Sequence, residues 1–97
     1  MKLKDRVDKT FQRYGEALLV NRKVPVRGFL QHVDGTQIAA YFGDEASVRL
    51  GMIALIPADV AVSSDDRITC RDRTYIVSRM CERRVRDMVV MQMALLR

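Results

Sequence analysis

The sequence has no tryptophan, a single histidine and only two cysteines, and this scarcity excludes several kinds of site. The three potential metal ligands of these types are His32, Cys70 and Cys81 among 97 residues. A structural zinc site takes about four ligands, and these three show no ligand-like spacing, so we expect no metal. In the absence of a secretory signal we expect both thiols to stay reduced and to pack as small hydrophobic groups.

Catalytic motifs are also missing. The five glycines are scattered, so no glycine-rich phosphate-binding loop is present, and His32 has no serine in a nucleophile-elbow context. The carboxylate pairs 44–45 and 65–66 lie in expected turns, where aspartate favours the backbone geometry. A glycosidase-type pair is the remaining enzymatic alternative. We expect no catalytic residues, no cofactor and no enzymatic activity.

Long apolar runs and aromatic residues are scarce as well. A membrane-spanning helix needs about 20 apolar residues, whereas the longest apolar stretch, 51–62, contains Pro57 and Asp59. Three tyrosines and three phenylalanines give little material for stacking single-stranded nucleic acid. The basic first residues are followed by no apolar segment, so we expect no secretory signal. The composition predicts a soluble intracellular protein without membrane contact.

Positive charge is what the chain has in excess. Seventeen lysines and arginines against twelve acidic residues give a net charge of +5. Arginines concentrate in the last third of the chain, where they either keep turns and strand edges soluble or contact DNA or an acidic partner. The candidates for such contacts are Arg71, Arg73, Arg83, Arg84 and Arg86.

The last third, 66–96, predicts a three-stranded antiparallel meander. Strands are expected at 67–70, 74–82 and 88–96, with turns at 71–73 and 83–87. Alternation in the middle strand places Tyr75, Val77, Arg79 and Cys81 on one face and Thr74, Ile76, Ser78 and Met80 on the other. The last strand is apolar on both faces apart from Gln92, so we expect it to be central in a barrel or covered by another element or subunit.

The first half predicts a helix followed by a hairpin. Leu3, Val7 and Phe11 form one stripe of an amphipathic helix over 3–14, which must dock on its own sheet or on a neighbouring subunit. A β-hairpin is expected over 16–33 and a long flexible loop over 34–50. Short extended segments are expected next at 51–56 and 60–62. Together with the three strands described above, they make up a β-meander region over 51–97.

Together these elements predict one domain over 1–97. Its fold class is mainly β, a small antiparallel β-barrel or sandwich of about six short strands with a short N-terminal helix and a long central loop. The chain carries more apolar surface than such a domain needs. The candidate subunit-interface residues are Val7, Phe11, Tyr41, Phe42, Val89, Met91 and Met93.

Several stretches occur in the order found in a known family. The main one is Asp65-Asp66-Arg67-Ile68-Thr69-Cys70-Arg71-Asp72-Arg73-Thr74-Tyr75-Ile76-Val77-Ser78-Arg79. Tyr14-Gly15-Glu16, Val26-Arg27-Gly28-Phe29-Leu30-Gln31, Leu55-Ile56-Pro57-Ala58-Asp59 and Ala94-Leu95-Leu96-Arg97 fit around it. From Tyr14 on, the chain resembles the small head–tail connector (head-completion or neck) proteins of tailed phages and prophage-like elements of Gram-positive bacteria.

The resemblance implies a β-barrel-like structural protein of the virion neck, made in the host cytoplasm. It implies a sixfold or twelvefold ring of this chain between the portal or adaptor and the tail-terminator or tail-tube proteins, with possible non-specific contact to DNA in the channel. The turn at 71–73 lacks the family's usual glycine, and the central loop is shorter. The position as adaptor, stopper or tail terminator therefore stays open, as does a headless tail-like particle. The alternative is a small basic nucleic-acid-binding β-barrel.

Overall fold

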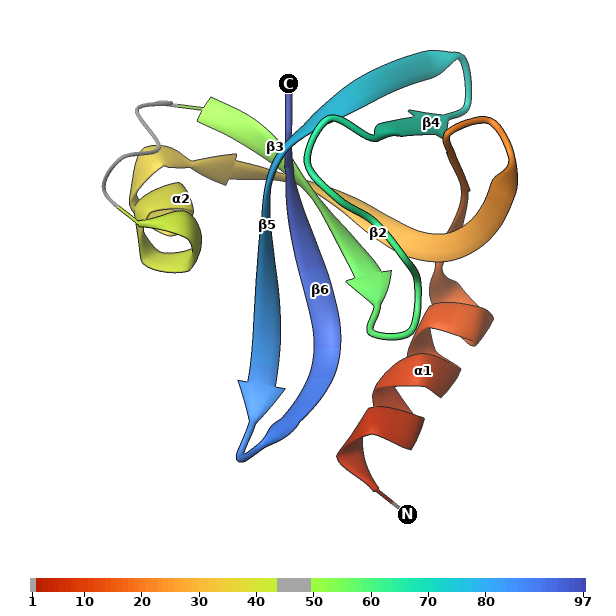
Figure 1. Ribbon diagram of the computed structural model, residues 1–97, viewed down its shortest axis with the longest axis vertical. Coiled ribbons are helices and arrows are strands. Elements are labelled where there is room, and N and C mark those ends of the chain that lie inside the picture. The colour runs from red at the N-terminus through yellow and green to blue at the C-terminus, as the bar shows by residue number, and fades with distance from the viewer. Residues whose placement is uncertain (1, 44–49) are drawn as a thin grey trace.

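The computed structural model describes residues 2–43 and 50–97, and within them six strands close into one antiparallel barrel (Figure 1). The elements are α1 (Leu3–Tyr14), β1 (Glu16–Val20), β2 (Val24–Asp34), α2 (Gly35–Phe42), β3 (Leu50–Pro57), β4 (Arg67–Cys70), β5 (Arg73–Val85) and β6 (Met88–Leu96). The strand order is β1-β2-β3-β6-β5-β4, and the pairing of β1 with β4 closes the barrel. The predicted mainly-β class with an N-terminal helix is confirmed.

The barrel interior is filled by one face of each strand. Leu18 and Val20 of β1, Ile68 of β4 and Val77 of β5 are at most 2% exposed. Ala54 and Ala94 face each other across β3 and β6 and are fully buried. Small side chains at this pair leave room for the larger residues of the opposite wall, as close packing requires.

The outer face of β3 and β6 carries a second apolar cluster, which α2 covers. Ile38 of α2 is fully buried against Val33, Ile53, Met93 and Leu95. One face of β6 lines the barrel, and the other is covered by α2 at Met93 and Leu95 and by α1 at Met91, so the strand is apolar on both faces. The prediction that this strand is central in a barrel or covered by another element is confirmed in both forms, and the covering helices belong to the same chain.

The helix α2 corrects the prediction of a flexible loop over 34–50. Asp34 caps the helix: its carboxylate accepts a hydrogen bond from the Gln37 amide at 2.9 Å, and the Gln37 side chain accepts one from the Asp34 amide at 3.1 Å. This reciprocal capping box begins the helix directly after β2. The part of the predicted loop over 44–49 lies outside the described residues.

A β-bulge in β5 corrects the predicted alternation of that strand. Val77 pairs with Leu96 and Arg79 pairs with Leu95, so Ser78 is an extra residue. Beyond the bulge Met80 packs against the barrel interior, whereas Cys81 joins the second cluster. Val77 and Met80 therefore lie on the same face of β5, although simple alternation predicted them on opposite faces.

The ends of β5 also differ from prediction. The strand continues through Val85, so the expected turn at 83–87 shrinks to Arg86 and Asp87. Strands β5 and β6 therefore form a long hairpin whose tip projects beyond the barrel (Figure 1). The expected extended segment at 60–62 is not a strand; it belongs to the connection 58–66 between β3 and β4.

Helix α1 docks on its own barrel. Phe11 is 2% exposed, and its ring centroid lies 5.4 Å from that of Phe29 in β2. A Cβ on Gly28, also in β2, would lie 2.5 Å from the carbonyl oxygen of Leu55 in β3, so glycine permits the close approach of these two strands. Of the two docking partners expected for the Val7–Phe11 stripe, the structure realises the chain's own sheet.

Candidate interaction surfaces

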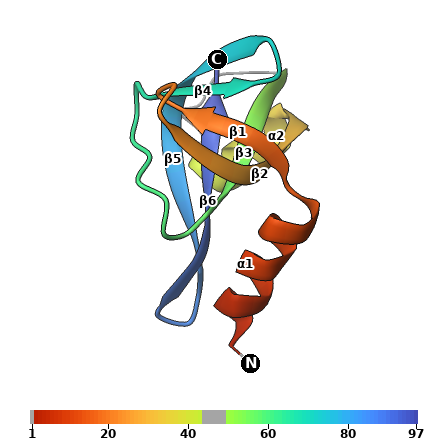
Figure 2. The ribbon, with the colours of Figure 1, turned by 90° about the vertical axis from the view of Figure 1, so that its right-hand side faces the viewer.

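The five candidate arginines lie at the two ends of the molecule. Arg71 lies in the turn between β4 and β5 and Arg73 begins β5, whereas Arg83, Arg84 and Arg86 lie at the tip of the β5–β6 hairpin. Figures 1 and 2 both place these two turns at opposite ends of the longest axis, which measures 38 Å. The five candidate arginines, although close in the sequence, therefore do not form a single basic face.

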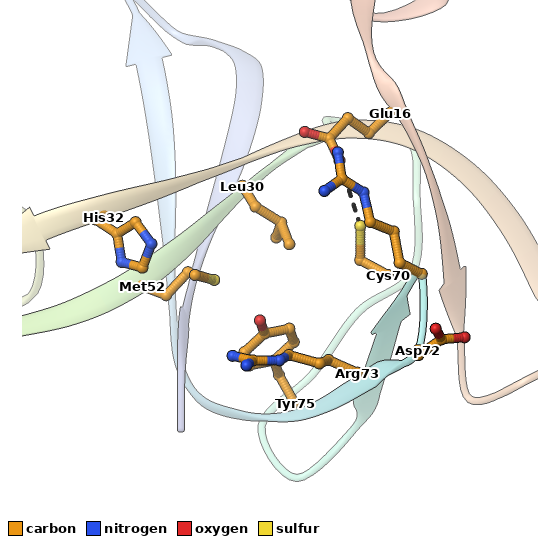
Figure 3. A pocket seen from close by; sticks show the side chains of 9 residues that line it. Glu16, Leu30, His32, Met52, Cys70, Asp72, Arg73 and Tyr75 are labelled. Atoms are coloured by element: carbon orange, nitrogen blue, oxygen red, sulfur yellow. Dashed lines mark hydrogen bonds and ion pairs between the residues drawn. The ribbon is translucent and has the colours of Figure 1, made fainter.

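At the first end, a pocket of about 450 Å³ opens above the barrel interior (Figure 3). The side chains of Leu30, Met52 and Tyr75 point into it and rest on the core cluster. Its polar rim is formed by Glu16, His32, Cys70, Arg71, Asp72 and Arg73. The pocket thus has an apolar floor and a rim of mixed charge.

Three of the rim groups, Glu16, Cys70 and Arg71, contact one another. The Cys70 thiol donates to Glu16 Oε2 at 3.4 Å, and Arg71 lies 3.6 Å from the same oxygen. Burial raises the pKa of Cys70, the hydrogen bond to Glu16 raises it further, and Arg71 opposes the shift. A thiol of raised pKa holds little nucleophilic thiolate at neutral pH. The described residues contain no group of three or more His, Cys, Asp or Glu side chains able to hold a metal ion.

At the second end, two of the three tip arginines are engaged within the chain. Arg84 lies 2.8 Å from a carboxylate oxygen of Glu82, and the Arg83 guanidinium lies 6.0 Å from the ring centroid of Tyr41. Arg86 occupies the turn with φ of 57° and is exposed. The tip is cationic, but two of its charges already have partners.

An apolar groove of about 820 Å³ lies between the hairpin tip and the start of α1. Its apolar lining comes from Leu3, Val85, Met88, Val89 and Val90. Leu3 and Val85 are each 46% exposed and Met88 is 40% exposed, so three of the five exposed large hydrophobic side chains in the described part of the chain lie together here. This concentration is unusual, because scattered apolar residues on a surface are common but clustered ones mark contacts.

The structure distributes the seven predicted interface residues over three places. Val89 lines the groove, Val7 and Met91 lie half-buried between α1 and the sheet, and Tyr41 and Phe42 pack half-buried on the second cluster. Phe11 and Met93 are each 2% exposed, so their candidacy for contact with a neighbour is corrected.

Sequence reasoning missed Val85 and Met88 as groove residues. They flank Arg86 and Asp87 in a stretch whose charges suggested a turn, although an apolar residue on each side of a two-residue turn is typical of a hairpin. Leu3 was placed on the correct helical stripe. Its position opposite the hairpin tip follows from the angle at which α1 docks, which periodicity does not give.

The connection 58–66 is a second ordered surface, and Gln92 holds it in place. The Gln92 side-chain nitrogen lies 2.7 Å from the Val60 carbonyl oxygen, 3.0 Å from that of Pro57 and 3.3 Å from that of Ala58. Gln92 is only 9% exposed. The single polar residue noted in the last predicted strand thus fixes a segment that has no regular secondary structure.

Comparisons with known proteins add no relative: no family model matches the chain, and no curated protein and no solved structure matches it. Among the described residues, no helix combines the length and the apolar character that crossing a membrane requires.

Proposed function

We propose that this chain is a structural subunit of a phage head–tail connector, which forms a ring that joins the portal or adaptor to the tail and closes around the DNA channel. The observation that carries the proposal is the exposed groove formed by Leu3, Val85 and Met88, which lies outside both hydrophobic clusters. In the closed barrel every strand is hydrogen-bonded to a neighbour on both sides, and apolar side chains already fill the interior. The exposed apolar side chains of the groove are therefore not needed to complete the fold. The groove therefore supports a role in assembly.

The ordered segments that resemble connector proteins give the proposal its specific form. They fall on the junction of α1 and β1, on β2, on the end of β3, on the β4–β5 hairpin and on the end of β6, and these strands belong to one barrel. The neighbours in the particle would be portal or adaptor proteins on one side and tail-terminator or tail-tube proteins on the other. The place of action would be the virion neck after assembly in the host cytoplasm.

The distribution of arginines favours the ring over the alternative, a monomeric nucleic-acid-binding barrel. That alternative requires one continuous basic face for phosphate contacts, whereas Arg71 and Arg73 lie at the opposite end from Arg83, Arg84 and Arg86. In a ring, arginines at either end of a subunit would meet an acidic neighbour or the phosphates of DNA passing through the lumen, without sequence preference.

The test is the mass and shape of the native protein at micromolar concentration, measured by light scattering after size exclusion and by electron microscopy. The proposal expects closed rings with six or twelve times the 11.1 kDa mass of one chain. DNA binding is then measured over a salt series. A monomer that binds DNA tightly, with affinity falling steeply as salt rises, would favour the nucleic-acid-binding alternative.

A further inference from the structure

The connection 58–66 differs in charge from the rest of the chain. It contains Asp59, Asp65 and Asp66 and no lysine or arginine, in a protein whose net charge is +5. Ala61, Ser64 and Asp65 are exposed, and Val60 and Val62 are half-buried against the barrel. This acidic loop, residues 58–66, therefore carries carboxylates beside small apolar side chains. Asp59 pairs with Lys4, Asp66 accepts a hydrogen bond from the Ser63 amide, and the exposed Asp65 lies 3.6 Å from an Arg97 nitrogen.

The groove beside α1 has the opposite charge. Lys2, Lys4 and Arg86 line it against a single acidic residue, Asp87. Lys2, the N-cap residue of α1, makes no side-chain capping hydrogen bond, and Asp5 is the acidic residue of the first turn. The apolar groove thus suits an apolar segment that carries carboxylates.

Within one chain, one ion pair joins the groove to the acidic loop. Lys4 Nζ lies 2.7 Å from Asp59 Oδ2 and 2.8 Å from Asp8 Oδ2. The start of the acidic loop borders α1, since Asp59, Val60 and Ala61 share a pocket with Asp8, Phe11 and Gln12. The rest of the loop runs up the barrel wall to β4 (Figure 2). The described lining of the groove includes no residue of the acidic loop of the same chain.

The acidic loop is held in a defined shape before any partner binds. Gln92 binds its first carbonyl groups, the Ser63 amide donates to Asp66 Oδ2 at 2.9 Å, and the Asp65 amide donates to the Val77 carbonyl at 2.8 Å. A preformed loop loses little conformational entropy on binding. This favours its use as a contact surface.

We infer that the acidic loop of one copy docks into the groove of the next copy, so that the subunit interface is head-to-tail. Two different, complementary patches on one chain generate a ring when the rotation between copies closes. This inference rests on the proposed ring function and specifies which surfaces meet in it.

A charge exchange tests the inference. One variant, Lys2→Glu with Arg86→Glu, makes the groove acidic. A second variant, Ala61→Lys with Ser64→Lys and Asp65→Asn, makes the exposed part of the loop basic. All five side chains are exposed, and asparagine tolerates the φ of 73° at position 65. Lys4 and Asp59 are left unchanged because their ion pair joins the loop to α1 within the chain. The second variant also removes the exposed pair between Arg97 and Asp65, whose atoms lie 3.6 Å apart, so the fold of this variant is compared with that of Asp65→Asn alone.

Each variant alone is expected to assemble at least about tenfold more weakly than the wild type, because like charges then meet at every interface. An equimolar mixture is expected to recover assembly as alternating rings with an even number of subunits. A chain carrying all five substitutions is expected to assemble by itself. The matched control is Arg13→Glu with Lys23→Glu, two exposed cations outside both patches and outside the candidate contact arginines, which should assemble as the wild type does.

Sedimentation velocity and electron microscopy give the readout, and circular dichroism confirms that each variant is folded. If the wild type forms rings and both charge variants still assemble normally, the assigned interface is refuted while the ring proposal stands. The same holds if the variants fail alone and the mixture does not recover. A wild type that stays monomeric even at millimolar concentration overturns the ring and the interface together.

Discussion

Replacing Gln92 by methionine tests whether this side chain holds the acidic loop. Methionine keeps the length of the side chain but removes both amide hydrogens, which serve the carbonyl groups of Pro57, Ala58 and Val60. A neutral hydrogen bond contributes about 1 kcal/mol net, and a buried carbonyl left without a donor costs about 1–3 kcal/mol. We therefore expect a loss of about 1–3 kcal/mol in the free energy of unfolding.

For a domain of this size each kcal/mol lowers Tm by roughly 4–8 °C. Thermal and urea unfolding measure the loss, and hydrogen exchange of amides in 58–66 localises it to the loop. The matched control is Gln31→Met on β2, an exposed glutamine, for which a change within about 0.5 kcal/mol is expected. If the Gln92 variant is as stable as the wild type and its loop amides exchange no faster, the assigned role is wrong.

A glutamate at position 92 gives an independent check with a definite sign. Its carboxylate would face carbonyl oxygens in a buried site, which raises its pKa in the folded state above that in the unfolded chain. Protonation then favours folding, so the Gln92→Glu variant should gain stability relative to the wild type as pH falls through the raised pKa, and lose it as pH rises. A stability difference that does not change with pH would contradict this reasoning.

Three further predictions concern the core, a close strand contact and the buried thiol. Ile38→Ala should cost about 2–5 kcal/mol in urea unfolding, because a fully buried side chain of α2 leaves a cavity over the sheet. Gly28→Ala should cost about 1–3 kcal/mol in the same assay, since its Cβ would lie 2.5 Å from the Leu55 carbonyl oxygen; an unchanged stability would show that the two strands separate easily. Cys70 should react slowly with alkylating reagents at neutral pH, and Glu16→Gln should lower its pKa and speed the reaction, as a pH series of alkylation rates will show.

The sequence was sufficient to predict the class of the fold and the places of most strands. Strand periodicity is a local property, because side chains alternate every two residues whatever the strand packs against. In β6 both alternating sets of side chains are apolar, and this local pattern indicated that both faces of the strand are buried. The amphipathic stripe Val7–Phe11 likewise predicted α1 before any partner for it was known.

Some candidate interface residues and the acidic loop needed the three-dimensional structure. Tyr41 and Phe42 were apolar residues in an apparent loop, and only packing of α2 on the outer sheet face gave them neighbours. Gln92 was a polar exception in an apolar strand. Its partners lie more than 30 residues away in sequence, a separation that no local pattern reports.

What the sequence by itself determined is the set of elements: strands, a helix with one apolar stripe, and an excess of positive charge. The tertiary structure decided how they meet. The bulge at Ser78 shifted the facing of β5, because one extra residue reverses alternation. An extended chain rises by about 3.3 Å per residue, so the length of β5 separates the arginines at its two ends. Arg71 and Arg73 therefore lie at the opposite end of the molecule from Arg83, Arg84 and Arg86.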